Sequence, residues 1–310
     1  MSVPVAPELR AKYSRIVREA LPGYSPRRIA LNAQGALNIV FDVDGRFIFR
    51  FPRAERGAKL LAMECRLLPR LARHLPLAIP EPLVVGSLPG RHGWPFMGYA
   101  RIPGRQLQWA RLSEPRFRAL VRGLAPAFQR LATFPGREAT RLGVPGGDPP
   151  TFRQEMTDLY ESLKKHGYPA IPDELRSQLD GRFRAYLDAP DNFRFRPTLL
   201  HGEVHSSHVL WKTERVSGLI DWGFASIGDP ARDFAPWVAH FGTRGIPQLM
   251  EGRTGPHDRT CLERLEFYRL LIPIWQIRNR AWEGNLKGAK EAVGWLRRAL
   301  KLPATEGWSR

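Results

Sequence analysis

LLHGEVHSSHVLW occupies residues 199–211 of the chain, and VSGLIDWG follows it at residues 216–223. Two apolar runs flank a short polar loop that holds three histidines and one carboxylate, and a further apolar run ends on Asp221. Apolar strands joined by polar loops place polar side chains at strand ends. Phosphoryl-transfer sites use such side chains to hold metal and phosphate. This stretch therefore indicates function more directly than any other part of the chain.

Three residues of this stretch have the side chains that a phosphoryl-transfer site needs. Glu203 follows Gly202, which permits unusual backbone angles, and a carboxylate there can orient a hydroxyl and accept its proton. His208 and Asp221 begin and end the two apolar runs, so a hairpin would bring them to one end as metal ligands. Taken singly, the three residues are better explained as a solvated loop acid, a packed histidine and a turn former. Together they predict one site.

Upstream of this stretch the pattern is mainly that of strands. Asp44-Gly45 is a strong hairpin signal between two of them. Pro103-Gly104 ends the last one. Periodicity predicts helices at 8–20 and 57–73, and strands at 28–31, 37–42, 46–51, 83–86 and 96–102.

The segment between the first two predicted strands contains Gln34 and Gly35 among small residues. Such a loop can bring backbone N–H groups close to phosphates. Taken alone, one glycine is better explained by an ordinary hairpin turn than by a phosphate-binding loop.

Beyond Gly104 the pattern becomes helical, with a Pro- and Gly-rich loop expected at 135–150 and a kink at Pro273. We therefore predict an α+β protein with a sheet-rich lobe at 1–104 and a larger helical lobe at 105–310, joined by a hinge at 98–104. The predicted helices are 113–133, 151–166, 173–188, 230–241, 258–283 and 287–301.

Length and composition narrow the class of protein. The chain has 310 residues, 43% of them hydrophobic, which suffices for a large core. No run of 18 apolar residues and no signal-peptide pattern occurs, so we expect a cytoplasmic protein with its two cysteines reduced. The net charge of +18 raises nucleic-acid binding as an alternative, but the arginines are scattered and form no basic tail.

The quoted residues carry a family resemblance. His201-Gly202-Glu203-x4-His208, with Ile220-Asp221-Trp222 and GDPARD at 228–233, resembles the aminoglycoside phosphotransferase family. RFIFRFPR at 46–53, ECRLL at 64–68 and GYARIPG at 98–104 extend the resemblance over nearly the whole chain. The family is similar in fold to protein kinases, which implies a bilobal kinase-like fold. Because His208 stands where most members carry Asn, macrolide phosphotransferases are closest in motif, although some aminoglycoside 2″-kinases share the histidine.

The resemblance implies a role for each matching residue. Glu203 would orient the acceptor hydroxyl, His201 would brace the loop, and Asp229 and Asp233 would hold the loop in shape. His208 and Asp221 would bind Mg²⁺. The donor nucleotide, ATP or GTP, would contact Arg50 with its partner Glu64, the loop at Gln34 and Gly35, and the hinge residues Tyr99, Ala100, Arg101 and Ile102.

Two positions depart from the family pattern. Glu203 replaces the usual Asp, and one extra methylene moves the carboxylate by roughly 1.5 Å, which can cost on the order of a hundredfold in rate. Arg50 replaces the usual Lys, so a planar fork stands where a point charge is normal. Both charges are nevertheless kept.

We therefore expect a nucleotide-dependent kinase of a small-molecule hydroxyl, and a macrolide 2′-phosphotransferase as its particular form. The surplus of bases over acids and the apolar C-terminal helices favour a large apolar acceptor over a polycationic aminoglycoside. The alternatives are an aminoglycoside or metabolite kinase of the same family and a catalytically weak regulatory protein on the same fold. His205 has no assigned role.

Overall fold

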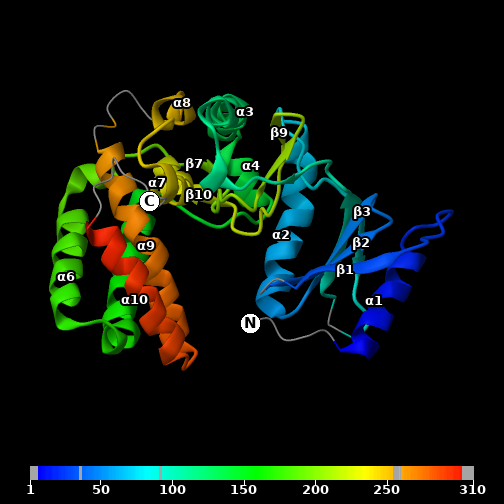
Figure 1. Cartoon of the computed structure of the whole chain (residues 1–310), viewed down its shortest axis with the longest axis horizontal. Coiled ribbons are helices and arrows are strands. Elements are labelled where there is room, and N and C mark those ends of the chain that lie inside the picture. The colour runs from blue at the N-terminus through cyan, green and yellow to red at the C-terminus, as the bar shows by residue number, and fades with distance from the viewer. Residues whose placement is uncertain (1–5, 35–36, 91–92, 254–257, 259, 302–310) are drawn as a thin grey trace.

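The computed structural model describes residues 6–34, 37–90, 93–253, 258 and 260–301 (Figure 1). Its elements form a sheet-rich N-terminal part and a mainly helical remainder, as predicted. In chain order they are α1 Pro7–Glu19, β1 Ile29–Gln34, β2 Asn38–Val43, β3 Phe47–Pro52, α2 Glu55–Ala72, β4 Pro82–Ser87, β5 Pro95–Ala100, β6 Arg105–Gln106, η1 Trp109–Arg111, α3 Glu114–Thr133, α4 Gly136–Arg141, α5 Pro149–Ser162, η2 Leu163–Gly167, η3 Tyr168–Ala170, α6 Asp173–Asp188, η4 Pro190–Phe193, β7 Thr198–Leu200, β8 Val209–Lys212, β9 Arg215–Leu219, β10 Ser226–Gly228, η5 Pro230–Phe234, α7 Ala235–Phe241, α8 Ile246–Met250, α9 Cys261–Trp282 and α10 Leu286–Lys301.

The N-terminal strands form an antiparallel sheet in the order β1-β2-β3-β5-β4. Side chains alternate across it, so the two faces have different contents. One face packs on α1, where Tyr13 stacks on Phe51 with ring centroids 4.3 Å apart. The other face carries Ile48 in a core shared with α2, and Arg50 is the next residue of β3 on this face. The sheet thus directs an arginine toward α2.

The predicted hairpin at Asp44-Gly45 is confirmed. Both residues have positive φ, 54° and 67°, the backbone that a tight turn between twisted strands requires. The Asp44 carboxylate accepts hydrogen bonds from the Tyr24 hydroxyl at 2.7 Å and the Arg28 N–H at 2.6 Å. These contacts tie the chain before β1 to the turn.

The C-terminal part holds the predicted second hairpin. Strands β8 and β9 pair antiparallel, with Val209 opposite Leu219, while β7 pairs with β10. In Figure 1, β7, β10 and α7 lie between the N-terminal sheet and the helices α6, α9 and α10, which form the far end of the molecule. The loop after β7 therefore begins near the centre of the molecule.

Some element predictions were wrong. The segment 135–150 contains α4, whose Ala139 is fully buried, and the start of α5, where Asp148 caps the helix by accepting from the Thr151 N–H. Residues 230–241 form a 3₁₀ turn and then α7 rather than one helix, since Asp229 caps the turn at Ala231. The division into lobes at residue 104 stays a prediction. In the described ranges no helix is long and apolar enough to cross a membrane.

Candidate active site

The loop after β7 begins with a backbone that only glycine adopts easily. Gly202 has a φ of 87°, and a Cβ at this position would lie 2.0 Å from the carbonyl oxygen of Phe224. The buried carboxylate of Asp233 accepts hydrogen bonds from the N–H groups of Gly202 at 2.7 Å and His201 at 3.3 Å. Asp233, a residue of η5, therefore holds the first turn of the loop in place.

His201 is fully buried and joins this loop to the end of the β8–β9 hairpin. Its Nε2 lies 3.1 Å from the carbonyl oxygen of Ile220, which can only accept, so Nε2 carries the proton. Its Nδ1 then accepts from the N–H of Glu203 at 3.3 Å. Burial lowers the pKa of His201 to about 4 and keeps the ring neutral. The bracing role stays a prediction, which these contacts support.

Glu203 is held by histidines on both sides of its backbone. Its N–H donates to His201, and its carbonyl oxygen lies 2.8 Å from Nδ1 of His208. Burial raises the pKa of the Glu203 carboxyl, His208 opposes this, and Asp221 adds to it. The carboxyl is thus a stronger proton acceptor than an ordinary glutamate while its backbone is held in place.

His208 and Asp221 face each other across the end of the hairpin, 3.5 Å apart between Nε2 and Oδ2. Because Nδ1 of His208 donates to a carbonyl oxygen, the neutral ring has its lone pair on Nε2. Two acceptor atoms then face each other, an arrangement that a bound cation relieves. Asp221 also has a φ of 67°, a strained backbone for a residue other than glycine and one found preferentially at functional sites.

This pair of side chains fits a magnesium site only with help from the substrate. No group of three or more His, Cys, Asp or Glu side chains that could hold a metal occurs in the described part of the chain. Mg²⁺ commonly takes one or two carboxylates and completes its shell with water and substrate phosphates. Asp221 supplies such a carboxylate, and its side chain is 44% exposed and therefore accessible.

Arg50 links the sheet to Asp221. Its Nη1 lies 2.6 Å from Oε2 of Glu64 in α2, and its Nη2 lies 3.5 Å from Oδ1 of Asp221. Burial works against the charge, but the carboxylates of Glu64 and Asp221 outweigh it and raise the pKa of Arg50. The expected pair of Arg50 and Glu64 thus exists, and the structure adds Asp221 to it.

The predicted nucleotide contacts are only partly described. Tyr99 and Ile102 are buried, and burial raises the pKa of Tyr99 to about 12, with Arg50, Glu64 and Asp221 acting on the same hydroxyl. The Arg101 side chain lines a cavity of about 940 Å³ and pairs with Asp42 at 3.2 Å. Ala100 ends β5. Gly35 lies outside the described residues, as does the side chain of Gln34.

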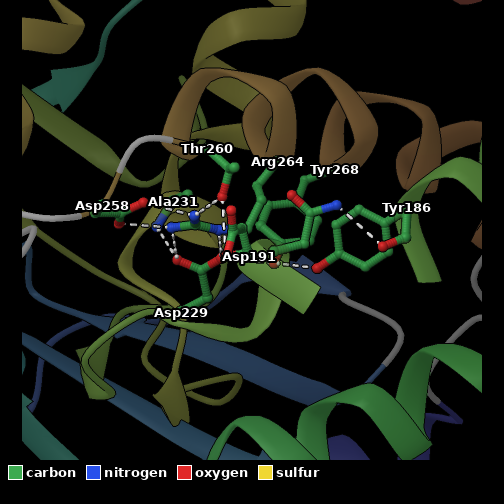
Figure 2. A network of polar contacts seen from close by, with 9 residues as sticks. Tyr186, Asp191, Asp229, Ala231, Asp258, Thr260, Arg264 and Tyr268 are labelled. Atoms are coloured by element: carbon green, nitrogen blue, oxygen red, sulfur yellow. Dashed lines mark hydrogen bonds and ion pairs between the residues drawn. The ribbon is translucent and has the colours of Figure 1, made fainter. Parts of the chain in front are cut away.

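A buried network holds Asp229, the first acid of the GDPARD motif (Figure 2). The Asp229 carboxylate accepts from Nε of Arg264 at 2.5 Å and from the Tyr268 hydroxyl at 2.6 Å. Arg264 also pairs with Asp258 at 2.6 Å, and Tyr268 shares a hydrogen bond with Tyr186 at 2.8 Å. The network joins η5 to α9 and thus stabilises the turn that carries Asp233.

Arg253 is a second partner that sequence reasoning missed. It is fully buried, and its Nη2 lies 3.1 Å from Oδ2 of Asp233, the carboxylate that holds the loop N–H groups. Its guanidinium lies over the rings of Phe128 and Phe234. Nothing in the local sequence around Arg253 or Arg264 distinguishes them from surface arginines, because their partners are distant in the chain.

The chain is similar to known proteins in both sequence and fold. The family described as "Phosphotransferase enzyme family" matches residues 28–268. Viomycin phosphotransferase from Streptomyces vinaceus is 28% identical over 267 residues, which cover 84% of this chain and 90% of that protein.

Two solved structures share the fold. The GDP complex of wild-type aminoglycoside 2′-phosphotransferase-IIIa superposes with a TM-score of 0.86 at 24% identity, over 94% of this chain and 98% of that one. Macrolide 2′-phosphotransferase MphH from Brachybacterium faecium superposes with a TM-score of 0.73 at 22% identity, over 95% and 99%. The α+β kinase-like fold expected from the sequence is thereby confirmed.

Proposed function

Since the chain belongs to the phosphotransferase enzyme family, we propose that it transfers the γ-phosphoryl group of a purine nucleoside triphosphate to a hydroxyl group of a small molecule. One observation carries the proposal. Asp221 lies 3.5 Å from both Arg50 and His208, beside the loop that carries Glu203. In the proposed reaction Arg50 is the phosphate-binding cation, His208 and Asp221 are the metal-binding pair, and Glu203 is the proton acceptor. Phosphoryl transfer requires these three components close together.

In this reaction Glu203 orients the acceptor hydroxyl and takes its proton. The hydroxyl oxygen forms the new bond to the γ-phosphorus, the bond from that phosphorus to the β–γ bridging oxygen breaks, and a nucleoside diphosphate leaves. Arg50 binds phosphate oxygens, and its pairing with buried Glu64 keeps the guanidinium in one orientation. The contribution of the chain is mainly positioning and charge neutralisation.

His208 and Asp221 are the residues that would hold Mg²⁺. When bound there, the ion would offset the negative charge of the phosphates. His201 keeps the two halves of this arrangement in register, because its ring contacts both the Glu203 N–H and the strand end before Asp221.

For the acceptor class, the similar proteins support the alternative better than the macrolide prediction. The viomycin enzyme matches over 84% of this chain, and the aminoglycoside enzyme superposes better than the macrolide enzyme, with TM-scores of 0.86 and 0.73. We propose an antibiotic-like acceptor of the aminoglycoside or viomycin type. For the donor, the GDP bound to the aminoglycoside enzyme favours testing GTP beside ATP.

The test is a phosphoryl-transfer assay in the presence of Mg²⁺, with γ-labelled ATP or GTP as the donor and viomycin, kanamycin or erythromycin as the acceptor. We expect label on viomycin or kanamycin. Glu203→Gln should lower kcat by about 10²- to 10⁴-fold, the usual contribution of a general base, while nucleotide affinity stays nearly unchanged. Unaltered turnover of this variant, or no transfer to any acceptor by the wild-type protein, would refute the proposal.

A further inference from the structure

An aromatic wall stands beside the loop that carries Glu203. It consists of Trp109 in η1, His205 in the loop and His240 in α7. The ring centroid of Trp109 lies 6.0 Å from that of His205 and 5.6 Å from that of His240. His205 is two residues from Glu203 and its ring is exposed, so it can contact a molecule whose hydroxyl faces Glu203.

The local contacts of His205 determine which of its nitrogens carries the proton. The backbone N–H of Ser207 lies 3.4 Å from Nδ1 of His205, and an N–H can only donate. Nδ1 is therefore the acceptor, and the neutral ring carries its proton on Nε2. Within the described ranges no hydrogen bond joins this Nε2–H to another residue, so it is an open donor beside the reacting position.

Trp109 adds a buried donor behind the wall. The residue is 4% exposed, and its Nε1 has no hydrogen-bond partner among the described residues. A buried donor without a partner costs about 1–3 kcal/mol, so such an atom calls for an explanation. Trp109 is packed against Trp237 and Phe241, which offer it ring contacts but no hydrogen-bond acceptor at this nitrogen.

The charge of the wall argues against an ammonium group of the ligand at this position. Partial burial lowers the pKa of both His205 and His240, and the nearby His208 and His240 lower that of His205 further, so both rings favour the neutral form. An ammonium group has only donors and needs a carboxylate or another acceptor opposite it. The wall instead presents the Nε2–H donor of His205, on a chain with a net charge of +18.

We propose that the acceptor substrate places a hydrogen-bond-accepting oxygen, such as a carbonyl, ether or hydroxyl oxygen, against the Nε2–H of His205, and no ammonium group. The inference rests on the proposed function, because it assumes that Glu203 faces the reacting hydroxyl. It makes His205 a specificity-determining residue of the acceptor site. It also narrows the acceptor to a molecule whose reacting hydroxyl has an oxygen-bearing neighbour on this side.

The test is equilibrium binding of viomycin and kanamycin to the full chain loaded with Mg²⁺ and a non-hydrolysable GTP or ATP analogue. In His205→Leu the affinity for the better-bound probe should fall about three- to tenfold, the size of one neutral hydrogen bond. His205→Gln, whose amide N–H reaches the position of Nε2, should restore affinity to within about twofold. Trp109→Phe, which removes the indole N–H and also shortens the ring that packs against His205, should weaken binding about twofold or more.

Three controls isolate the contribution of the His205 hydrogen bond. His166 also packs against a tryptophan, Trp282, but it does not belong to the wall. His166→Leu makes the same substitution there and should leave the affinity for the probe unaltered. Nucleotide affinity should be unchanged in every His205 variant. His205→Glu adds a carboxylate and should not improve binding; tighter binding of kanamycin by this variant would overturn the inference, as would unchanged affinity in His205→Leu or no binding of either probe.

The same samples separate the inference from the proposed function. Probe binding that follows the predicted order without phosphoryl transfer would refute the proposed function, and the hydrogen bond to His205 would then belong to a ligand that is not an acceptor. Normal transfer with an acceptor KM that no His205 variant alters would refute the inference alone.

Discussion

Two side chains are longer than the family resemblance leads one to expect, and the structure shows how one of them is accommodated. Glu203 stands where Asp is usual, and its backbone N–H and carbonyl oxygen are held by His201 and His208. Because both sides of the residue are fixed, the loop cannot readily shift toward the acceptor to compensate for a shorter side chain. The extra methylene of Glu203 then sets the position of the carboxylate.

Glu203→Asp should therefore lower kcat, by about ten- to a hundredfold, since a displacement of about an ångström has effects of this size. Steady-state kinetics with the acceptor identified by the transfer assay measures it, and nucleotide affinity should not change. A higher kcat in this variant would mean that the wild-type site is a weakened form of the aspartate site.

His201 should make the stability of the protein depend on pH. Its pKa is lowered from 6.5 to about 4 in the folded state, so below pH 6.5 protons bind to the unfolded chain more readily than to the folded chain. The stability contributed by the neutral ring is complete above pH 6.5 and is lost as pH falls toward 4. Between pH 7 and pH 5 this linkage amounts to about 2 kcal/mol.

Chemical denaturation of the wild-type protein and His201→Asn at both values of pH tests this prediction. Asparagine cannot titrate, so the free energy of unfolding of the wild-type protein should fall by about 2 kcal/mol more than that of the variant. Parallel pH dependence of the two proteins would contradict the lowered pKa.

At the scale of elements, two buried ion pairs join segments that are distant in the sequence. Arg264 of α9 pairs with Asp229 at the start of η5, and Arg50 of β3 pairs with Glu64 of α2. Removing one partner of a buried pair leaves an uncompensated charge, which costs about 3–5 kcal/mol. Both pairs therefore lend themselves to mutational tests.

Arg264→Leu should lower the free energy of unfolding by about 3–5 kcal/mol, because Asp229 then stays buried without its partner. Adding Asp229→Asn to this variant should recover part of the loss, since the two residues interact directly. Urea denaturation measures all three proteins. Tyr268→Phe, which removes the hydrogen bonds of this hydroxyl to Asp229 and Tyr186, should cost less than Arg264→Leu, about 2–3 kcal/mol.

Arg50→Met should destabilise the protein by about 3–5 kcal/mol for the same reason, whereas Arg50→Lys keeps the charge and should cost less. The lysine variant should nonetheless lower kcat, because a point charge cannot contact Glu64 and Asp221 as the planar fork does. Unfolding curves and kinetics together distinguish these effects. Equal stability of both variants would show that the ion pair contributes little.

At the scale of the molecule, the sheet and the helical part share one core, in which Ile48 of β3 and Leu67 of α2 belong with Phe128 of α3. A ligand that contacts both parts therefore stabilises the whole chain by mass action. The proposed nucleotide is such a ligand, since Arg50 belongs to the sheet and Asp221 to the region beyond residue 104.

Mg²⁺ with GTP or ATP should raise the melting temperature in proportion to the logarithm of nucleotide concentration, equivalent to about 2.7 kcal/mol at a hundred times Kd. EDTA should remove most of this gain if His208 and Asp221 hold the metal. Asp221→Asn should respond to nucleotide but no longer to EDTA. A gain that is independent of Mg²⁺ in the wild-type protein would contradict the metal site.

The local parts of this protein follow from its amino-acid sequence. The alternation at 37–51 with Asp44-Gly45 determined a hairpin, and the spacing from Glu203 to His208 and Asp221 brought three polar groups to one hairpin end, because neighbours along paired strands are close in space. The expected loop at 135–150 was wrong because packing of Ala139, and not local propensity, makes α4 a helix.

The contacts that surround these local elements follow from the tertiary structure alone. The partners of Asp229 and Asp233 are arginines that lie 35 and 20 residues further along the chain. The wall of Trp109, His205 and His240 likewise joins three separate segments. Such contacts depend on how helices and loops pack against one another. That packing is set by the whole core, so no local sequence pattern specifies it.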